Sequence, residues 1–318
     1  MTASSNRSSQ IQSGFRMGRC PMTGWSMLMR WTLIPQLMKW VFATATLILG
    51  LSTSLLANPV STQHVQAELG SVVTSIEPGT SFWVILHLRM QAGWHTYWQN
   101  PGDAGLATAI NWVLPEGLEA GEMVWPYPQR IPVGPMMNYG YEGEVSLLTQ
   151  ITAPATLVPG QHLGLRAETT WVVCAKICVP EAATLELRLP VHAAKAQEDT
   201  RWMAVWAQAQ PTLLRPTPWQ TVFSGTRETL TLSLATPQFA ATRLAEVTFF
   251  PLAYGIIDHA APQQISVSNQ GLRLTVRRGP LDSAELAHVD GVLVLKEMRD
   301  GESHVNAFTI RAVPAQAH

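Results

Sequence analysis

The sequence predicts an all-β chain, in which an immunoglobulin-like antiparallel β-sandwich is followed by a second, smaller β-sandwich. Of its 318 residues, 47% are hydrophobic and 14% are charged, which is too apolar a composition for a disordered chain. The 22 glycines and 22 prolines separate short β-favouring segments and are too frequent for a helical bundle.

Residues 1–57 have the pattern of a signal peptide and leader. They contain five basic residues and no Asp or Glu, and they end in an apolar run from Val41 to Ala57. We expect cleavage after Ala57, which would also remove Cys20. Without these five positive charges the net charge falls from -1 to -6, which argues against nucleic acid or an anionic membrane as a partner.

The exported chain would keep one close pair of cysteines, Cys174 and Cys178. Such a pair suits a compartment that permits disulfides, and the periplasm of a Gram-negative bacterium fits best. No later stretch approaches twenty apolar residues, so no membrane span is expected after signal cleavage.

Residues 58–193 are predicted to form the immunoglobulin-like domain. Turn signals such as Glu77-Pro-Gly and Asn100-Pro-Gly-Asp separate about seven strand segments. The expected strands are Val65–Ile76, Phe82–Met90, Trp94–Trp98, Thr108–Leu114, Val145–Ala153, Leu163–Val173 and Ala183–Val191.

Residues 194–221 are predicted to be a helix and a linker, and residues 222–318 a second β-sandwich domain. The helix would end at Pro211 and present Met203, Trp206 and Ala207 on one apolar face. The second domain has no cysteine, so we expect it to play a positioning role. Its expected strands are Thr229–Leu234, Glu246–Phe250, Gln264–Ser268, Leu272–Arg277, Gly291–Lys296 and Val305–Ala312.

The two remaining cysteines lie between two β-favouring runs, Leu165–Val173 and Ala183–Val191. Bridged cysteines need Cα atoms within about 4.4 to 6.8 Å, whereas four extended residues span roughly 13 Å. The chain must therefore turn between them. This spacing predicts a β-hairpin with Cys174 and Cys178 facing each other across its neck.

A disulfide that closes so small a loop stabilises a fold by only about 2 kcal/mol, so it has limited value as a structural clamp. A tight, exposed bond is more readily reduced, which suits a pair that opens and closes. Lys176 lies inside the loop and could favour a thiolate. His95 and Glu181 are the nearest candidates for proton handling, although the position of His95 between Trp94 and Tyr97 also fits a structural histidine.

Two alternative functions remain open at this stage. The first is a periplasmic copper(I)-binding protein, in which two thiolates and a methionine or His95 would hold the metal. The second is a non-catalytic adaptor whose disulfide is structural. Zinc is disfavoured because no second cysteine pair exists. We predict no resident metal site and no cofactor.

The stretch from Trp125 to Gly143 is predicted to be a long loop rich in proline and glycine. It carries four apolar side chains that a solvated loop has no local reason to hold: Met136, Met137, Tyr139 and Tyr141. We expect this loop to cover the cysteine pair; the alternative is an ordinary well-packed loop.

Several stretches resemble the periplasmic N-terminal region of the DsbD/ScsB-type thiol:disulfide interchange proteins, a protein-disulfide reductase family. The resemblance is greatest to the ScsB-like branch, which is associated with suppression of copper sensitivity. In the first domain the similar stretches are Gly93–Gly105, Trp112–Gly117, Trp125–Pro128, Asn138–Gly143 and Trp171–Glu181, and in the second domain they are Phe249–Leu252 and Ile257–Gln263.

The resemblance implies that Cys174 and Cys178 form a redox-active pair. The pair would receive electrons from a membrane-embedded thiol reductase domain or protein and pass them to oxidised periplasmic proteins, including thioredoxin-like ones. Cys178 would face the partner and Cys174 would resolve the mixed disulfide. The resemblance also implies a cap loop over Met136–Tyr141, with Tyr139 or Tyr141 as its shielding aromatic.

Two departures from this family limit what can be transferred. The best-known members have a longer spacing between the two cysteines. The relatives also continue into transmembrane helices and a thioredoxin-like domain, whereas this chain stops at His318. We therefore expect either a separate membrane protein or a truncated gene product, and an oxidoreductase that works as part of a larger system.

Overall fold

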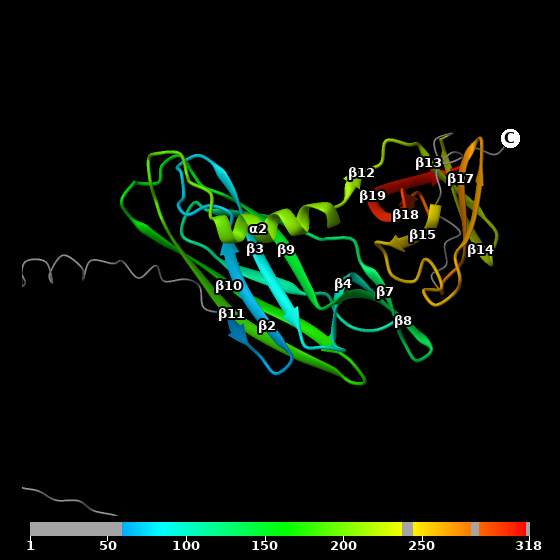
Figure 1. Cartoon of the computed structure of the whole chain (residues 1–318), viewed down its shortest axis with the longest axis horizontal. Coiled ribbons are helices and arrows are strands. Elements are labelled where there is room, and N and C mark those ends of the chain that lie inside the picture. Colours follow the sequence, from blue (N-terminus) through cyan, green and yellow to red (C-terminus); the bar gives the residue numbers. More distant parts are fainter. Residues whose placement is uncertain (1–58, 237–243, 281–285, 316–318) are drawn as a thin grey trace, which may run out of the picture. The chain divides into compact units, whose positions relative to one another are not determined.

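The computed structural model describes residues 59–236, 244–280 and 286–315. The predicted signal peptide lies outside these residues. The predicted all-β class is confirmed, because three β-sheets, joined by one short α-helix, account for most of the described chain (Figure 1). No helix in the described part of the chain has the length and apolar character that a membrane crossing needs.

The first two sheets face each other as a sandwich. One has five strands in the order β1-β2-β3-β9-β6, and the other has the order β11-β10-β4-β8-β7, with β5 paired to β10. The strands of the first sheet are β1 (Val60–Ser61), β2 (Val65–Ser71), β3 (Ser81–Met90), β9 (Glu144–Thr152) and β6 (Glu119–Val124). Those of the second are β11 (Cys178–Pro190), β10 (His162–Cys174), β4 (His95–Gly102), β8 (Met136–Glu142), β7 (Gln129–Val133) and β5 (Ala109–Val113).

Alternating side chains from both sheets fill the core of this sandwich. Leu86 and Leu147 come from the five-stranded sheet, and Trp171 and Leu185 come from the six-stranded sheet; all four are buried in one cluster. Successive residues of a strand point to opposite faces, so the residues next to these core positions lie on the outer faces. The seven strands expected here all exist, although β2 ends at Ser71 rather than at Ile76.

The prediction of a long loop between Trp125 and Gly143 was wrong, because this stretch contains the β-hairpin of β7 and β8. Val133 pairs with Met136, which leaves Gly134 and Pro135 as a two-residue turn, and Gly134 has a φ of 60°. Pro132 lies in β7, which is the last strand of its sheet, and an edge strand tolerates a residue that cannot donate a hydrogen bond.

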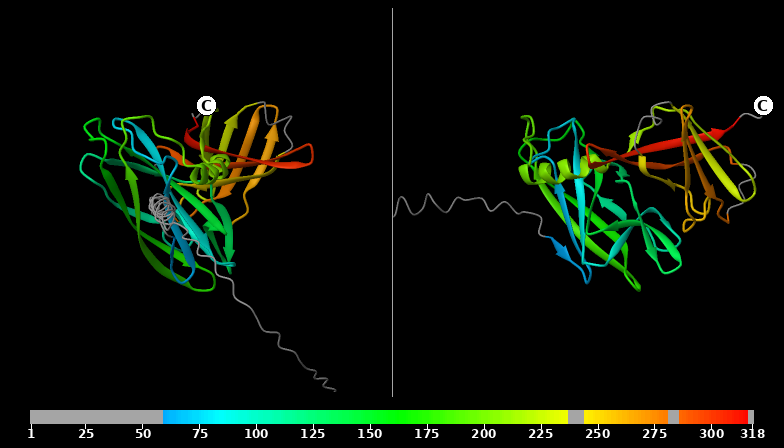
Figure 2. Two further views of the ribbon diagram at one scale, coloured as in Figure 1. Left: turned by 60° about the vertical axis from the view of Figure 1, so that its left-hand side comes forward. Right: turned by 45° about the vertical axis from the view of Figure 1, so that its right-hand side comes forward.

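The single described helix, α2 (Thr200–Ala209), packs against the outer face of the five-stranded sheet (Figures 1 and 2). It begins later than the expected residue 194, because the Asp199 side chain caps the backbone N–H groups of Arg201 and Trp202. Trp202 is the buried anchor of its apolar face, whereas the predicted Ala207 is exposed. A 3-10 turn over Gln210–Thr212 follows.

The remaining strands form one eight-stranded sheet around a second core. Its order is β15-β18-β19-β13-β14-β17-β16, with β12 paired to β19, and two of its pairings, β12 with β19 and β13 with β19, are parallel. The strands are β12 (Arg215–Pro216), β13 (Thr221–Gly225), β14 (Thr229–Ala235), β15 (Leu244–Pro251), β16 (Gln264–Ser268), β17 (Gly271–Arg277), β18 (Val289–Arg299) and β19 (Glu302–Pro314). The six strands expected in this region are present, and β12 and β13 were not predicted.

Strand β15 and the segment after it contact the first sandwich. Phe250 packs edge-on against Tyr139, at 4.9 Å between ring centroids, and against Trp98, at 6.2 Å. The Asn100 side chain donates a hydrogen bond to the carbonyl oxygen of Pro251, at 2.8 Å. The core of the sandwich therefore extends onto residues of β15.

Candidate redox site

The predicted cysteine hairpin is confirmed. Strands β10 and β11 are antiparallel and pair residue by residue from His162 opposite Pro190 to Cys174 opposite Cys178. The two cysteines form a disulfide, with their Cα atoms 4.1 Å apart. Between them the backbone N–H of Ala175 donates to the carbonyl of Ile177 at 3.2 Å, which closes the turn.

The two sulfur-bearing residues differ sharply in exposure. Cys174 is only 3% exposed, whereas Cys178 is exposed along with its neighbours Lys176 and Ile177. An incoming thiolate must approach along the axis of the S–S bond and reach the sulfur that it attacks. The exposed Cys178 is the sulfur that such a group can reach.

The disulfide lies on the outer face of the six-stranded sheet. Trp171 and Val173 point into the core, so alternation places Cys174 on the opposite face. In the sheet, Cys174 stands opposite Cys178 on one side and opposite His95 on the other. His95 and Tyr97, two positions apart on β4, therefore share the face of the disulfide.

A small polar cluster adjoins the exposed sulfur. The Tyr97 hydroxyl lies 3.4 Å from the Sγ atom of Cys178. The side-chain nitrogen of Asn138, on β8, lies 3.2 Å from Nε2 of His95 and 3.5 Å from the Tyr97 hydroxyl oxygen. The edge-on rings of His95 and Tyr97 are 5.1 Å apart.

Burial sets the protonation of this cluster. Loss of solvation lowers the pKa of His95, against a smaller opposing effect of Glu142, so the imidazole is neutral at neutral pH. Burial also raises the pKa of Tyr97 to about 12, so its hydroxyl keeps its hydrogen at any physiological pH. Next to the sulfur there is therefore a permanent hydrogen-bond donor.

Gly105 fixes the position of the Tyr97 ring. Its φ is 106°, in the region that favours glycine, and a Cβ atom at this position would lie 2.3 Å from the ring. The backbone therefore lies flat against the tyrosine, in a way that no other residue type permits.

The predicted auxiliary residues have different surroundings. Lys176 is exposed in the turn between the cysteines. Glu181 accepts hydrogen bonds from the His64 ring at 2.8 Å, from the His64 backbone N–H at 3.0 Å and from the Trp171 indole at 3.3 Å. The two contacts with His64 hold Glu181 against the turn between β1 and β2, and the third links it to Trp171 on β10. Its proposed proton-handling role stays a prediction.

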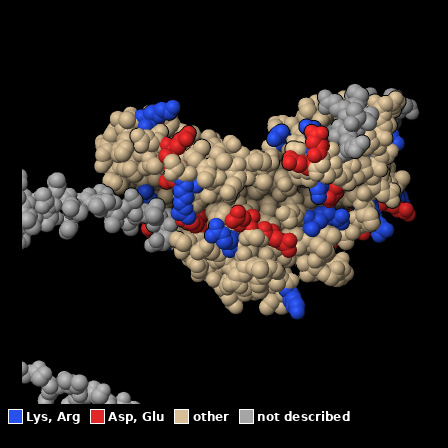
Figure 3. Space-filling view, in the orientation of Figure 1, with Lys and Arg blue, Asp and Glu red and all other residues tan. Residues whose placement is uncertain are grey.

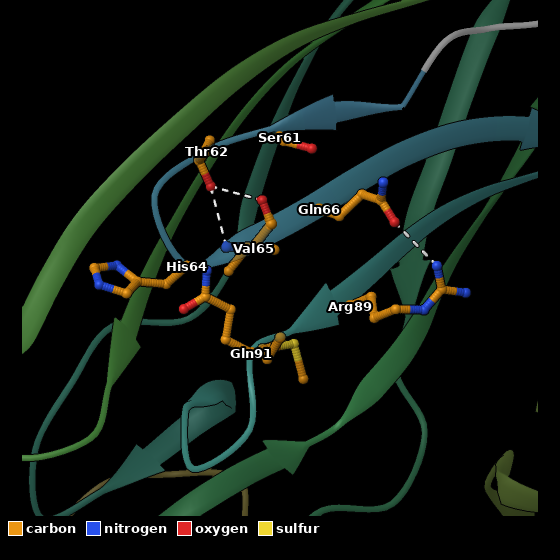
Figure 4. Close-up of a pocket in the computed structure, with 8 residues that line it drawn as sticks. Ser61, Thr62, His64, Val65, Gln66, Arg89 and Gln91 are labelled. Carbon is orange, nitrogen blue, oxygen red and sulfur yellow. Dashed lines mark hydrogen bonds between the residues drawn. The ribbon is translucent and has the colours of Figure 1, made fainter. Parts of the chain in front are cut away.

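That turn borders a pocket of about 220 Å³ (Figure 4). Several of its polar side chains form hydrogen bonds: Arg89 donates to Gln66 at 3.0 Å, and the Thr62 hydroxyl donates to the carbonyl of Val65 at 2.8 Å. The His64 ring is turned away from Arg89 and Gln66 in this view, and it stacks on Trp94 with centroids 3.7 Å apart. This pocket contains no part of the disulfide.

The four predicted cap residues all lie on β8 but not on one face. Tyr139 and Tyr141 are buried in the core cluster, and Tyr141 donates to the carbonyl of Pro126 at 2.8 Å. Met137 is half-buried against the same core, while Met136 is 38% exposed. Alternation along β8 places Asn138, rather than either tyrosine, on the face of the disulfide.

The hairpin of β7 and β8 is held by Asp103 and by the segment after β15. One carboxylate oxygen of Asp103 accepts from the backbone N–H of Met137 at 2.7 Å, and the other contacts Nδ1 of His259 at 2.8 Å. Arg130 on β7 donates to the carbonyl of His259 at 2.8 Å. The sequence Asn100-Pro-Gly-Asp predicted only a turn at this position. In the structure Asp103 also links the hairpin to His259.

Tyr97 and Asn138 are the functional candidates that sequence reasoning missed. Tyr97 could have been found by its spacing of two from His95, once β4 was known to face the cysteines. Asn138 is separated from both by about forty residues, and only the pairing of β4 with β8 brings it close.

On the face shown in Figure 3, lysine and arginine are interspersed with aspartate and glutamate. Within the described ranges there is no group of three or more His, Cys, Asp or Glu side chains arranged to hold a metal ion.

The fold and the site together define a β-sandwich protein with a surface disulfide at a hairpin end. Residues 63–190 match the family described as thiol:disulfide interchange protein DsbD, N-terminal. This stretch of the chain is a DsbD-type N-terminal domain.

One solved structure agrees with this fold. The N-terminal periplasmic domain of ScsB from Proteus mirabilis is 18% identical, with a TM-score of 0.58; the match covers 81% of this chain and 98% of that one. A protein of unknown function from Porphyromonas gingivalis W83 is 11% identical with a TM-score of 0.23, covering 78% and 99% of the two chains. A search of curated proteins gave no match.

Proposed function

We propose that this chain is a periplasmic thiol:disulfide exchange module. Electrons would pass between a membrane-embedded thiol reductase and oxidised, thioredoxin-like periplasmic proteins through Cys174 and Cys178. The observation that carries the proposal is the asymmetry of the pair: an exposed sulfur next to a hydrogen-bond donor, bonded to a buried sulfur.

This asymmetry supports separate roles for the two sulfurs. A partner thiolate attacks the exposed Cys178 and forms a mixed disulfide with it, while Cys174 leaves as a thiolate. In the opposite direction Cys178 attacks a partner disulfide, and Cys174 resolves the product. A structural clamp has no need for one exposed sulfur.

Trapping with single-cysteine variants tests these roles. In a Cys20→Ser background, Cys174→Ser keeps the exposed sulfur and should accumulate a mixed disulfide with an oxidised thioredoxin-like protein. Cys178→Ser is the matched control and should trap little. Trapping through Cys174 alone would reverse the assignment, and trapping through neither would remove the proposed exchange function.

The shielding role predicted for the hairpin is retained in a narrower form. Tyr139 and Tyr141 point into the core, whereas alternation places Met136 on the same face of β8 as Asn138. We therefore propose Met136 as the residue that limits access to the pair. The hydrogen bond from the Met137 backbone N–H to Asp103 holds this part of β8 in place. A Met136→Ala variant should then react faster with a small thiol reagent at Cys178, without a change in unfolding temperature.

The alternative function, copper(I) binding, uses the same two cysteines in a different way. It requires reduced Cys174 and Cys178 to bind stoichiometric Cu(I), with His95 or a methionine as a further ligand. Titration of the reduced chain with Cu(I) distinguishes it: saturation at one ion per chain, abolished by oxidation, would favour the metal carrier over exchange.

A further inference from the structure

The atoms in contact with the sulfur of Cys178 show which of them donates the hydrogen bond. A sulfur in a disulfide carries no hydrogen, so in the contact of 3.4 Å between Tyr97 and Cys178 the tyrosine hydroxyl must be the donor. The direction of this bond follows from covalent chemistry alone.

Asn138 supplies a second, independent argument for the same direction. Its amide nitrogen has two hydrogens and two neighbouring acceptors, Nε2 of His95 and the hydroxyl oxygen of Tyr97. With that oxygen accepting from Asn138, the single hydroxyl hydrogen of Tyr97 is left for the sulfur. This direction requires a neutral His95 whose hydrogen is on Nδ1, because a hydrogen on Nε2 would face the amide hydrogens.

We propose that Tyr97 stabilises the thiolate of Cys178 by donating a hydrogen bond to it, and that His95 and Asn138 position the Tyr97 hydroxyl for this purpose. The proposal deepens the exchange function proposed above and rests on it for its biological meaning. Tyr97 touches the reacting sulfur and is a catalytic residue in this scheme; His95 and Asn138 act only through it.

The hydroxyl acts in the second half of the reaction with a partner dithiol. First, a partner thiolate bonds to Cys178 while the bond between the two cysteines breaks, and its electron pair leaves on Cys174, which takes a proton from solvent. Second, the other partner thiolate attacks its own bonded sulfur, and Cys178 leaves with the electron pair. Two electrons have then moved from the partner to the pair.

A thiolate needs stabilisation more than a disulfide sulfur does. Hydrogen bonds to charged acceptors are stronger than those to neutral ones, so the same Tyr97 contact is worth more after Cys178 has been released than before. The contact therefore lowers the pKa of the Cys178 thiol and makes Cys178 the better leaving group. In the reverse direction it raises the fraction of Cys178 present as the nucleophile.

The decisive variant is Tyr97→Phe, which removes one hydroxyl and keeps the ring. In a Cys20→Ser, Cys174→Ser background, the pH dependence of iodoacetamide alkylation gives the pKa of Cys178 directly. We expect the thiolate fraction at pH 7 to fall about tenfold, the effect of losing one hydrogen bond to a charged group. An unchanged pKa would overturn the proposal.

A matched control and a double variant test whether Asn138 positions the Tyr97 hydroxyl or whether the substitutions disturb the site in general. Tyr127→Phe removes another half-buried tyrosine hydroxyl, away from the disulfide, and should leave the pKa of Cys178 unchanged. Asn138→Leu should raise that pKa, and it should add nothing in the presence of Tyr97→Phe, because Asn138 acts through the hydroxyl. Additive effects would show that Asn138 does not position Tyr97.

The same set of proteins separates this inference from the exchange function. If Tyr97→Phe shifts the pKa but the unmodified chain fails to exchange with a thioredoxin-like dithiol, the thiolate contact is correct and the proposed function is wrong. If the chain exchanges normally and the pKa does not move, the function stands and the role of Tyr97 is wrong.

Discussion

Gly105 shows how a single backbone position supports the chemistry of another residue. Gly105→Ala adds a Cβ atom 2.3 Å from the Tyr97 ring at a φ of 106°, so it should cost both steric overlap and backbone strain. We expect a loss of about 2 to 4 kcal/mol of unfolding free energy. Chemical denaturation measures this loss.

Gly160→Ala is the appropriate comparison. Gly160 also has a positive φ, of 95°, but an added Cβ would meet nothing within 4 Å. This variant should pay the backbone cost alone, about 1 kcal/mol. Equal losses in the two variants would show that Tyr97 is not held by Gly105.

His95 makes stability depend on pH in a predictable direction. Its folded-state pKa is lowered by burial, so on acidification the unfolded chain binds a proton before the folded chain does. Stability from this residue is therefore full above about pH 6.5 and falls as the pH decreases towards the lower folded-state pKa.

The slope of unfolding free energy between pH 7.5 and 5 measures this effect. His95→Gln should make the slope shallower, by at most one proton or about 1.4 kcal/mol per pH unit. His162→Gln, at an exposed position of β10, should leave it unchanged. Identical slopes for His95→Gln and the unmodified chain would contradict a buried neutral His95.

Among the elements, the hairpin of β7 and β8 depends on residues distant in the sequence. Asp103 accepts from the Met137 backbone and contacts His259, which is itself buried. Asp103→Asn removes the negative charge at this junction, so the amide of Met137 should exchange with solvent about tenfold faster. Hydrogen exchange resolved to single amides detects this change.

Asp290→Asn provides the comparison for that experiment. Asp290 pairs with Arg311, whose hydrogen bond lowers the Asp290 pKa, but it lies on β18 in the eight-stranded sheet. It should leave Met137 exchange unaffected. Equal acceleration in both variants would mean that Asp103 does not hold the hairpin specifically.

The sequence was most informative where structure is local. Cys174 and Cys178 are four positions apart, so their geometry follows from chain dimensions, and the hairpin between β10 and β11 could be predicted with its register at the neck. The alternating segment Ala183–Val191 identified β11 for the same reason, since a period of two needs no distant information.

The sequence was least informative where the conformation of a segment depends on the strands beside it in the sheet. Pro132 reads as a break in any strand, and only its place at a sheet edge makes β7 permissible. The expected cover over the cysteine pair stays a proposal. The faces on which Tyr139 and Asn138 lie follow from strand alternation, which a predicted loop does not have. The contact of Asn138 with His95 is likewise a consequence of pairing between β4 and β8.

For the whole molecule, Phe250 links two cores that a domain boundary near residues 194–221 would separate. It is 2% exposed and packs on Tyr139 and Trp98, although it belongs to β15. Phe250→Ala should lower the unfolding free energy by about 3 to 5 kcal/mol and split one thermal transition into two. Differential scanning calorimetry would show the second transition.

Phe223→Ala tests whether this splitting is specific. Phe223 is also buried, but only in the core of the eight-stranded sheet. Truncation of Phe223 should destabilise the core of that sheet. It should leave the packing on the first sandwich unchanged. A single transition for both variants would mean that the link through Phe250 does not couple the two regions.

The central claim is that Cys174 and Cys178 open and close in function, and the reduction potential of the pair tests it most directly. Equilibration of the chain, with Cys20→Ser, in thiol redox buffers gives this value. We predict a potential within the range of working oxidoreductases, about -120 to -270 mV. A value well below about -300 mV would identify a structural disulfide and contradict the exchange function.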